Sequence, residues 1–182
     1  MRNSRKLFFF LIITILFSFS SNSDWITINA KKYTFQIPTS MSEMEELNTE
    51  ADAQYGYVEN VDDEVLELYL IILLETHKEI KKYKLAEEFT PLSYWELAAE
   101  SLVEGIDESK ILTEELETEY VNGMGCVRGE IWGKFGEVEV IYHLGVYKGE
   151  YAFYQVLTWT IADQHPRFKD EMEHMINSVR EK

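Results

Sequence analysis

The sequence predicts an α+β fold in which helices cover a largely antiparallel β-sheet, and two patterns lead to this class. From Gly123 to Thr160, apolar and polar residues alternate, glycines interrupt the run and no proline occurs, which indicates three consecutive antiparallel strands. The segments 90–106 and 166–180 repeat apolar residues at steps of three and four, as amphipathic helices do. A chain of 182 residues is long enough for one domain with a sizeable core.

The N-terminal segment, residues 1–23, has the pattern of a secretory signal peptide. Three basic residues precede an apolar run from Leu7 to Phe17, and small polar residues follow. A membrane span needs about 20 apolar residues, so this run is too short for an uncleaved anchor. We therefore expect cleavage, no stable membrane insertion afterwards, and a secreted or periplasmic domain formed by residues 24–182.

The composition is strongly acidic, with 17 Lys and Arg against 33 Asp and Glu and a formal net charge of −16. Loss of the signal segment would remove three basic residues and make the protein more acidic still. Such a charge repels nucleic acid and anionic lipid, so neither is expected as a partner. Two interpretations remain: a solvated coat that keeps an exported protein soluble, or a surface that binds a basic protein or a cation.

The single cysteine, Cys126, excludes an internal disulfide. Within a predicted strand it is expected to be a small buried hydrophobe. An intermolecular disulfide or a reactive thiol is the alternative, but the neighbouring Glu119 and Glu130 would disfavour the thiolate.

The first elements predicted are a hairpin and a central strand. The hairpin consists of Trp25 to Ile28 and Tyr33 to Ile37. A weaker strand follows over 53–60, and an acidic turn, Asp62-Asp63-Glu64, leads into the apolar run from Val65 to Leu74. Because this run is apolar on both faces, we expect it in the middle of the sheet.

Three helices are expected, each with a recognisable start. Thr76 and Glu79 have the spacing of a capping box. Thr90-Pro91 begins the second helix, which Gly105 ends, and the third covers Pro166 to Arg180. The two longer helices have apolar stripes formed by Trp95, Ala98, Ala99, Leu102, Val103 and Ile106, and by Phe168, Met172, Met175, Ile176 and Val179.

The segment from Ile111 to Tyr120 fits either a helix or a strand. We predict a strand from Leu112 to Tyr120, because Asn122-Gly123 directly after it is a strong hairpin signal. The meander then has four strands.

Register follows if Asn122-Gly123, Phe135-Gly136 and Lys148-Gly149 are all two-residue turns. One face of the meander is then almost entirely apolar, and Tyr142 covers the backbone that Gly129 leaves bare. The cross-strand pairs expected on this face include Val127 with Leu144, Gly129 with Tyr142, and Leu144 with Phe153.

On the opposite face the same count aligns a polar row of Glu117, Arg128, His143 and Tyr154, which is the candidate ligand-binding site. Arg128 would hold an anionic group and His143 would be its titrating neighbour. The alternative is an ordinary cross-strand ion pair between Glu117 and Arg128, worth ~0.2–1 kcal/mol, with the other two residues beside it.

No enzyme signature stands out elsewhere in the chain. His77, His165 and His174 are scattered, and no Cys or His pair has the spacing of a zinc site. A nucleophile elbow, a P-loop and a dinucleotide-binding glycine pattern are also missing from the sequence. We therefore predict no catalytic residues, no metal and no cofactor.

The order of elements resembles the PsbP-like group of α/β/α sandwiches, which includes PsbP of photosystem II and the Ran-binding Mog-type proteins. The resemblance covers Tyr33 to Arg180 and rests on the proline-ended strand Tyr33 to Pro38, the strand Tyr151 to Val156 and the helix ending Ile176 to Val179. It is closer to small exported bacterial members than to PsbP itself. It implies a protein that binds other proteins rather than catalysing a reaction, and no functional residue is carried over.

Two function classes follow. The leading hypothesis is an exported, non-enzymatic binding or accessory protein of the bacterial envelope that acts on a protein partner whose basic charge would match its own acidity. The alternative is a small-ligand binder or hydrolase that uses the polar row.

Overall fold

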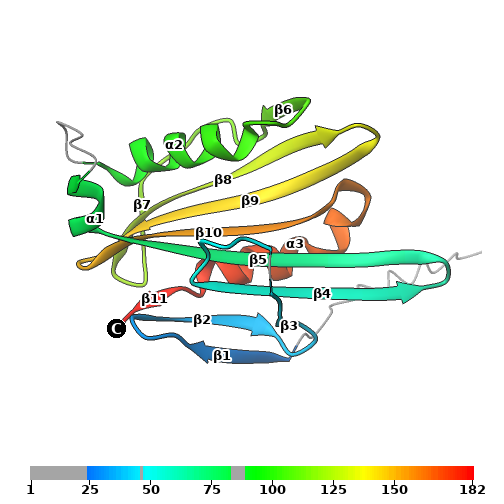
Figure 1. Ribbon diagram of the computed structural model, residues 1–182, viewed down its shortest axis with the longest axis horizontal. Coiled ribbons are helices and arrows are strands. Elements are labelled where there is room, and N and C mark those ends of the chain that lie inside the picture. The colour runs from blue at the N-terminus through cyan, green and yellow to red at the C-terminus, as the bar shows by residue number, and fades with distance from the viewer. Residues whose placement is uncertain (1–23, 46, 83–88) are drawn as a thin grey trace, which may run out of the picture.

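The computed structural model describes residues 24–45, 47–82 and 89–182, which build two antiparallel sheets and the helices that cover them (Figure 1). The predicted signal segment, residues 1–23, lies outside the described residues. Within them, no helix is both long enough and apolar enough to cross a membrane.

The large sheet has the strand order β3-β4-β5-β10-β9-β8-β6, with β7 paired to β8 as well. All its pairs are antiparallel, and β5 lies inside the sheet as predicted. Its strands are β3 (Ser42–Glu43), β4 (Ala53–Val61), β5 (Glu64–Thr76), β6 (Glu108–Ile111), β7 (Glu119–Val121), β8 (Met124–Phe135), β9 (Val138–Lys148) and β10 (Ala152–Ile161).

The small sheet joins the two ends of the described chain. Strands β1 (Trp25–Asn29) and β2 (Tyr33–Pro38) form the predicted opening hairpin, and β11 (Arg180–Glu181) pairs with the other edge of β2. The closing helix was predicted to reach Arg180, which is wrong. Helix α3 (His165–Asn177) ends three residues earlier, and β11 then pairs with the free edge of β2 through backbone hydrogen bonds.

The other helices begin as the capping signals predict. Thr76 and Glu79 exchange capping hydrogen bonds before α1 (His77–Lys82), and Thr90 caps α2 (Pro91–Val103) by accepting from the backbone N–H of Ser93. Gly105 follows the end of α2 with φ of +89°, which favours glycine. A short 3₁₀ turn, η1 (Ala162–Gln164), connects β10 to α3.

The large sheet separates two apolar cores. Helix α2 covers one face over β8 and β9, while α3 lies on the opposite face against β9 and β10 and also contacts β2 (Figure 1). The first core contains Trp95, Val127 and Leu144, as the predicted apolar face requires. The second core lies between the large sheet, α3 and the small sheet, and it buries Cys126 completely as a free thiol.

The register of the meander differs from the prediction at two of its three turns. Asn122-Gly123 is the predicted hairpin turn, with both residues at positive φ. The next turn is Gly136-Glu137, one residue later than predicted, and the last connection is a longer loop between Lys148 and Phe153. The observed pairs are Val127 with Val146, Gly129 with Leu144, and Leu144 with Leu157.

These shifts have a simple structural consequence. A glycine marks a turn without fixing which position of the turn it takes. Each error moved the cross-strand partners by an even number of residues, so the side chains of these strands kept their predicted faces. The cover of Gly129 changes as well: a Cβ there would lie 2.7 Å from Cζ2 of Trp95, so Trp95 and not Tyr142 packs over this glycine.

The single strand predicted from Leu112 to Tyr120 is also wrong. The chain pairs with β8 first as β6 and again as β7, and residues 112–118 between them have no regular structure. Leu116 from this segment packs beside Trp95 over Gly129, since its Cδ2 lies 2.9 Å from the position of a Cβ there. The irregular segment thus contributes Leu116 to the first core.

Candidate functional site

The four residues of the predicted polar row do not lie side by side. Glu117 is exposed in the irregular segment between β6 and β7, and Tyr154 on β10 is fully buried opposite Tyr147. Arg128 lies opposite Gly145 rather than His143. The row does not form because Arg128, His143 and Tyr154 are moved by the two register shifts and Glu117 lies outside a strand.

Arg128 instead forms contacts near the C-terminal end of α3. Its guanidinium forms an ion pair with Glu119 on β7 and donates a hydrogen bond to the side chain of Asn177. The ion pair is partly exposed, so it resembles the ordinary cross-strand interaction that the sequence offered as the alternative, with Glu119 in place of Glu117.

Tyr154 belongs to a different polar group at the junction with the small sheet. Its hydroxyl donates to Oε1 of Glu181 at 2.7 Å, and the backbone N–H groups of Glu150 and Tyr151 donate to the same carboxylate at 2.7 and 3.0 Å. Burial together with the nearby Glu181 carboxylate raises the pKa of Tyr154 well above its usual range.

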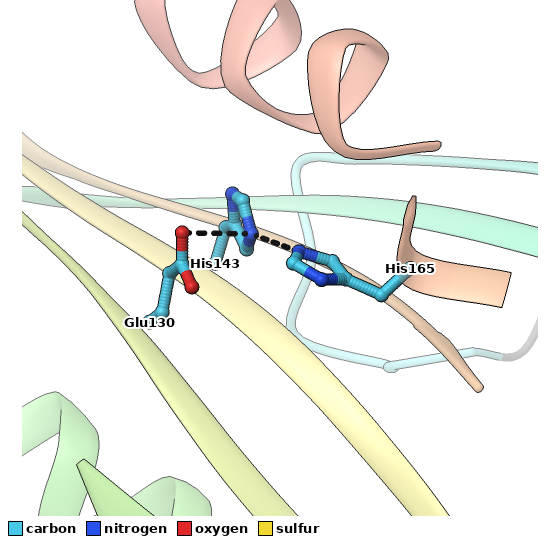
Figure 2. A group of neighbouring side chains, drawn as sticks. All are labelled: Glu130, His143 and His165. Carbon is cyan, nitrogen blue, oxygen red and sulfur yellow. Dashed lines mark hydrogen bonds and ion pairs between the residues drawn. The ribbon is translucent and has the colours of Figure 1, made fainter. Parts of the chain in front are cut away.

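His143 takes part in a cluster that the sequence did not predict. It lies on β9 directly opposite Glu130 on β8, and its Nε2 is 3.6 Å from Oε1 of Glu130. Its Nε2 also lies 2.9 Å from Nε2 of His165, the first residue of α3. Figure 2 shows the imidazole of His143 between the other two side chains, all three pointing toward one another from β8, β9 and α3.

Both imidazoles of the cluster favour the neutral form. Burial lowers the pKa of His143 to about 4, against an opposing effect of the Glu130 carboxylate, while His165 and Lys169 lower it further. Burial also lowers the pKa of His165. Lys169 on α3 completes the electrostatics, with its Nζ 3.4 Å from Oε1 of Glu130.

The cluster borders a pocket of about 290 Å³ between the sheet and α3. Arg128, Glu130 and His143 line it together with Thr113, Glu173 and Asn177, so two residues of the predicted row do share one cavity. The three donor atoms of Glu130, His143 and His165 lie within 4.8 Å of one another, a spacing at which carboxylate and imidazole groups can hold a metal ion.

The sequence carried only a weak signal for this cluster. Glu130 and His143 can be paired by counting once the turn at Gly136-Glu137 is known. His165 has no local pattern that connects it to them, because η1 and the start of α3 bring it back over the sheet.

A second surface lies on the opposite face, between α2 and β6. It is an apolar groove of about 420 Å³ whose edge carries Glu96, Glu100 and Lys110. Residues 96–119 contain nine acidic residues and one basic residue, and all nine acidic side chains are exposed. The apolar lining is formed by Trp95, Ala99, Val103, Ile111, Leu116 and Ile131.

Comparisons by sequence give no assignment, since no family model matches the chain and no curated protein matches it either. Comparison by structure identifies the fold. The chain is similar to LpqN of Mycobacterium tuberculosis, a protein involved in cell envelope biogenesis, with a TM-score of 0.55, 8% identity and coverage of 88% of this chain and 92% of that one. It is also similar to CyanoP, the cyanobacterial PsbP of Synechocystis sp. PCC 6803, with a TM-score of 0.55, 12% identity and coverage of 88% and 94%. The α+β PsbP-like fold predicted from the sequence is thereby confirmed.

Proposed function

We propose that this chain is an exported accessory protein of the bacterial cell envelope and that it binds another protein through the groove between α2 and β6. The observation that carries the proposal is the composition of this groove, which has an apolar lining together with two carboxylates, Glu96 and Glu100, and Lys110. Leu97 and Ile111 beside it are both 47% exposed, which adds apolar surface at its edge. An apolar centre inside a charged rim is the usual anatomy of a protein interface.

The acidic surface around the groove favours a basic partner. Glu96 and Glu100 line the groove, and residues 96–119 as a whole carry nine acidic residues and one basic residue, so this part of the surface would repel an acidic protein and attract a basic one. The partner expected here is a protein segment with an apolar side chain that enters the groove and flanking Lys or Arg residues that meet the rim. This is the basic protein partner that the overall acidity permits.

The location is supported by two independent features. The N-terminal pattern of basic residues, an apolar run and small polar residues is that of an export signal. The fold is shared over most of the chain with LpqN, which is described as involved in cell envelope biogenesis.

The test is site-specific crosslinking from the groove. A photoreactive amino acid at Leu97 in the exported protein is expected to capture one partner through a segment rich in Lys or Arg, and Glu96→Lys with Glu100→Lys should reduce the capture by about tenfold at low ionic strength. The control, Glu43→Lys with Glu64→Lys, makes the same charge change on exposed residues of β3 and β5. If both double variants capture the partner equally well, the groove is not the binding site. If fractionation finds this protein only in the cytoplasm, it is not a protein of the envelope.

A second candidate function retains Arg128 and His143, because both line the pocket beneath α3. In that case the pocket would hold a small anionic ligand against the Arg128 guanidinium. Arg128→Ala tests this second candidate. If the variant is less stable but binds ligand and partner as before, Arg128 only connects β7 to α3 and the pocket is not a binding site.

A further inference from the structure

We propose that Glu130, His143 and His165 bind a divalent first-row metal ion, with Zn²⁺ as the best match. Two imidazole nitrogens and one carboxylate oxygen form a donor set that zinc takes in proteins, with a fourth position left for water or another ligand. Glu130 and His143 come from paired positions on two central strands, so their backbones are held rigidly.

The distances fit a common metal ion. Two nitrogen ligands that are each about 2.0–2.1 Å from zinc and subtend 90–110° lie roughly 2.8–3.4 Å apart. The two Nε2 atoms of His143 and His165 are 2.9 Å apart. Nε2 of His143 lies 3.6 Å from Oε1 of Glu130, and all three donor atoms lie within 4.8 Å of one another, so metal binding requires the Glu130 side chain to rotate toward the two rings.

The two rings can serve as ligands without rearrangement. An imidazole coordinates a metal through an unprotonated ring nitrogen. Without a metal, the two facing nitrogens share one hydrogen bond, in which either ring can be the donor according to its tautomer. A metal ion would accept both nitrogens as ligands instead.

The surroundings contain one competitor and one unsatisfied polar group. The competitor is Lys169 on α3, whose ammonium already neutralises the Glu130 carboxylate and also reaches Glu173 at 3.7 Å. The unsatisfied group is the hydroxyl of Thr158, directly opposite His143 on β10, which is fully buried without a hydrogen-bond partner among the described residues. A bound metal would fix the orientation of the His143 ring, and with it the polar surroundings of Glu130 on one side and Thr158 on the other.

The metal site is independent of the proposed partner groove. The groove lies on the face of the sheet covered by α2, whereas the cluster lies on the face covered by α3. A charge reversal at Glu96 and Glu100 should therefore leave metal affinity unchanged, and the loss of a histidine should leave partner capture unchanged. Each proposal can fail without the other.

The experiment is calorimetric titration of Zn²⁺ into the purified, metal-stripped protein. We expect one equivalent to bind, and His165→Asn and Glu130→Gln each to weaken the Kd by at least about tenfold, because even the loss of a residue that only orients a ligand has effects of that size. Both substituted residues are half-buried rather than core residues, so the variants are expected to fold. The control is His174→Asn, which removes an exposed histidine of the same helix that stacks on Trp25.

Two further measurements make the outcome decisive. Co²⁺ in place of Zn²⁺ should give visible absorption bands of a low-coordinate site in the native protein and in His174→Asn but not in His165→Asn. Lys169→Gln should tighten Zn²⁺ binding by roughly twofold to fivefold, since a like charge beside the carboxylate is removed. The proposal is overturned if Zn²⁺ fails to bind, or if it binds equally well to His165→Asn and Glu130→Gln.

Discussion

Two polar clusters on this molecule each contain a glutamate and one residue of the predicted row, yet they are built in opposite ways. Around Glu181, every observed neighbour donates: the Tyr154 hydroxyl and two backbone N–H groups converge on one carboxylate. Around Glu130, the neighbours His143 and His165 turn nitrogen atoms toward each other and toward the carboxylate.

The difference separates a structural role from a candidate binding role. The Glu181 carboxylate already has its donors, and these hydrogen bonds lower its pKa although burial opposes them. In the Glu130 cluster, two imidazoles that donate or accept according to their tautomer face a carboxylate, with the Lys169 ammonium at its edge. A cluster of donors around an acceptor stabilises the fold by itself, whereas a carboxylate with two neutral imidazoles can also hold an added cation.

Glutamate-to-glutamine exchange at the two sites should give the largest contrast. We expect Glu181→Gln to reduce the free energy of unfolding by about 2–3 kcal/mol, because the hydrogen bonds lose a charged acceptor and the amide NH2 group would face one of the present donors. Glu130→Gln should change it by less than about 1 kcal/mol, since the contact with Lys169 is half exposed. Urea denaturation of metal-free protein measures both values.

The same pair of variants can break the comparison. If Glu130→Gln destabilises the protein as much as Glu181→Gln does, then the histidine cluster is a structural network and the distinction drawn between the two sites is wrong. Tyr154→Phe provides the matched control, because it removes the hydroxyl and keeps the ring that packs against Tyr33.

The sequence predicted those parts of the fold that depend on local signals. The opening hairpin, the central position of β5, the start of α2 and the turn at Asn122-Gly123 each follow from a residue pattern a few positions long. The exact positions of the other two hairpin turns depend on how the chain around Gly136 and Gly149 fits the twisted sheet, which the pattern does not contain. The faces of the strands were nevertheless predicted, because side chains alternate with a period of two.

The candidate site was predicted only in part. Arg128 and His143 belong to the predicted row and line the same pocket, but counting from a turn placed one residue too early gives them the wrong cross-strand neighbours. His165 matches no zinc-site spacing, because such spacing is a local criterion. This residue approaches His143 only through the tertiary packing of α3. Glu181 was missed for the same reason, since it reaches Tyr154 from the far end of the chain.

Acid should affect the two clusters in different pH windows. The folded pKa of His143 is about 4, below the 6.5 of an unperturbed histidine, so the unfolded chain binds this proton first and stability falls as the pH drops from 6.5 toward 4. A difference of this size between the folded and unfolded pKa corresponds to a loss of about 3 kcal/mol once the ring is protonated. The Glu181 carboxylate, with its lowered folded pKa, stabilises the protein above the unfolded pKa of about 4.3, and this contribution is lost below it.

Denaturation of metal-free protein at several pH values between 7.5 and 3.5 resolves the two windows. His143→Gln should flatten the slope between pH 6.5 and 4, whereas Glu181→Gln should leave that slope intact and remove the additional loss at lower pH. An unchanged slope in His143→Gln would show that another group is protonated there.

The smallest effect is expected from Gly149→Ala, which tests how tightly the Glu181 cluster is closed. A Cβ at Gly149 would lie 2.4 Å from Oε1 of Glu181, so the carboxylate would have to move away from its donors at a cost of about 1 kcal/mol. The control is Gly125→Ala, whose Cβ would meet only Cγ of Pro91 at 3.5 Å. In the Glu181→Gln background the cost of Gly149→Ala should shrink, because the contacts that it disturbs are already weakened, and a double-mutant cycle measures this coupling. If the two alanine costs are equal and additive with Glu181→Gln, the Glu181 carboxylate is loosely held, and the contrast with the open histidine cluster disappears.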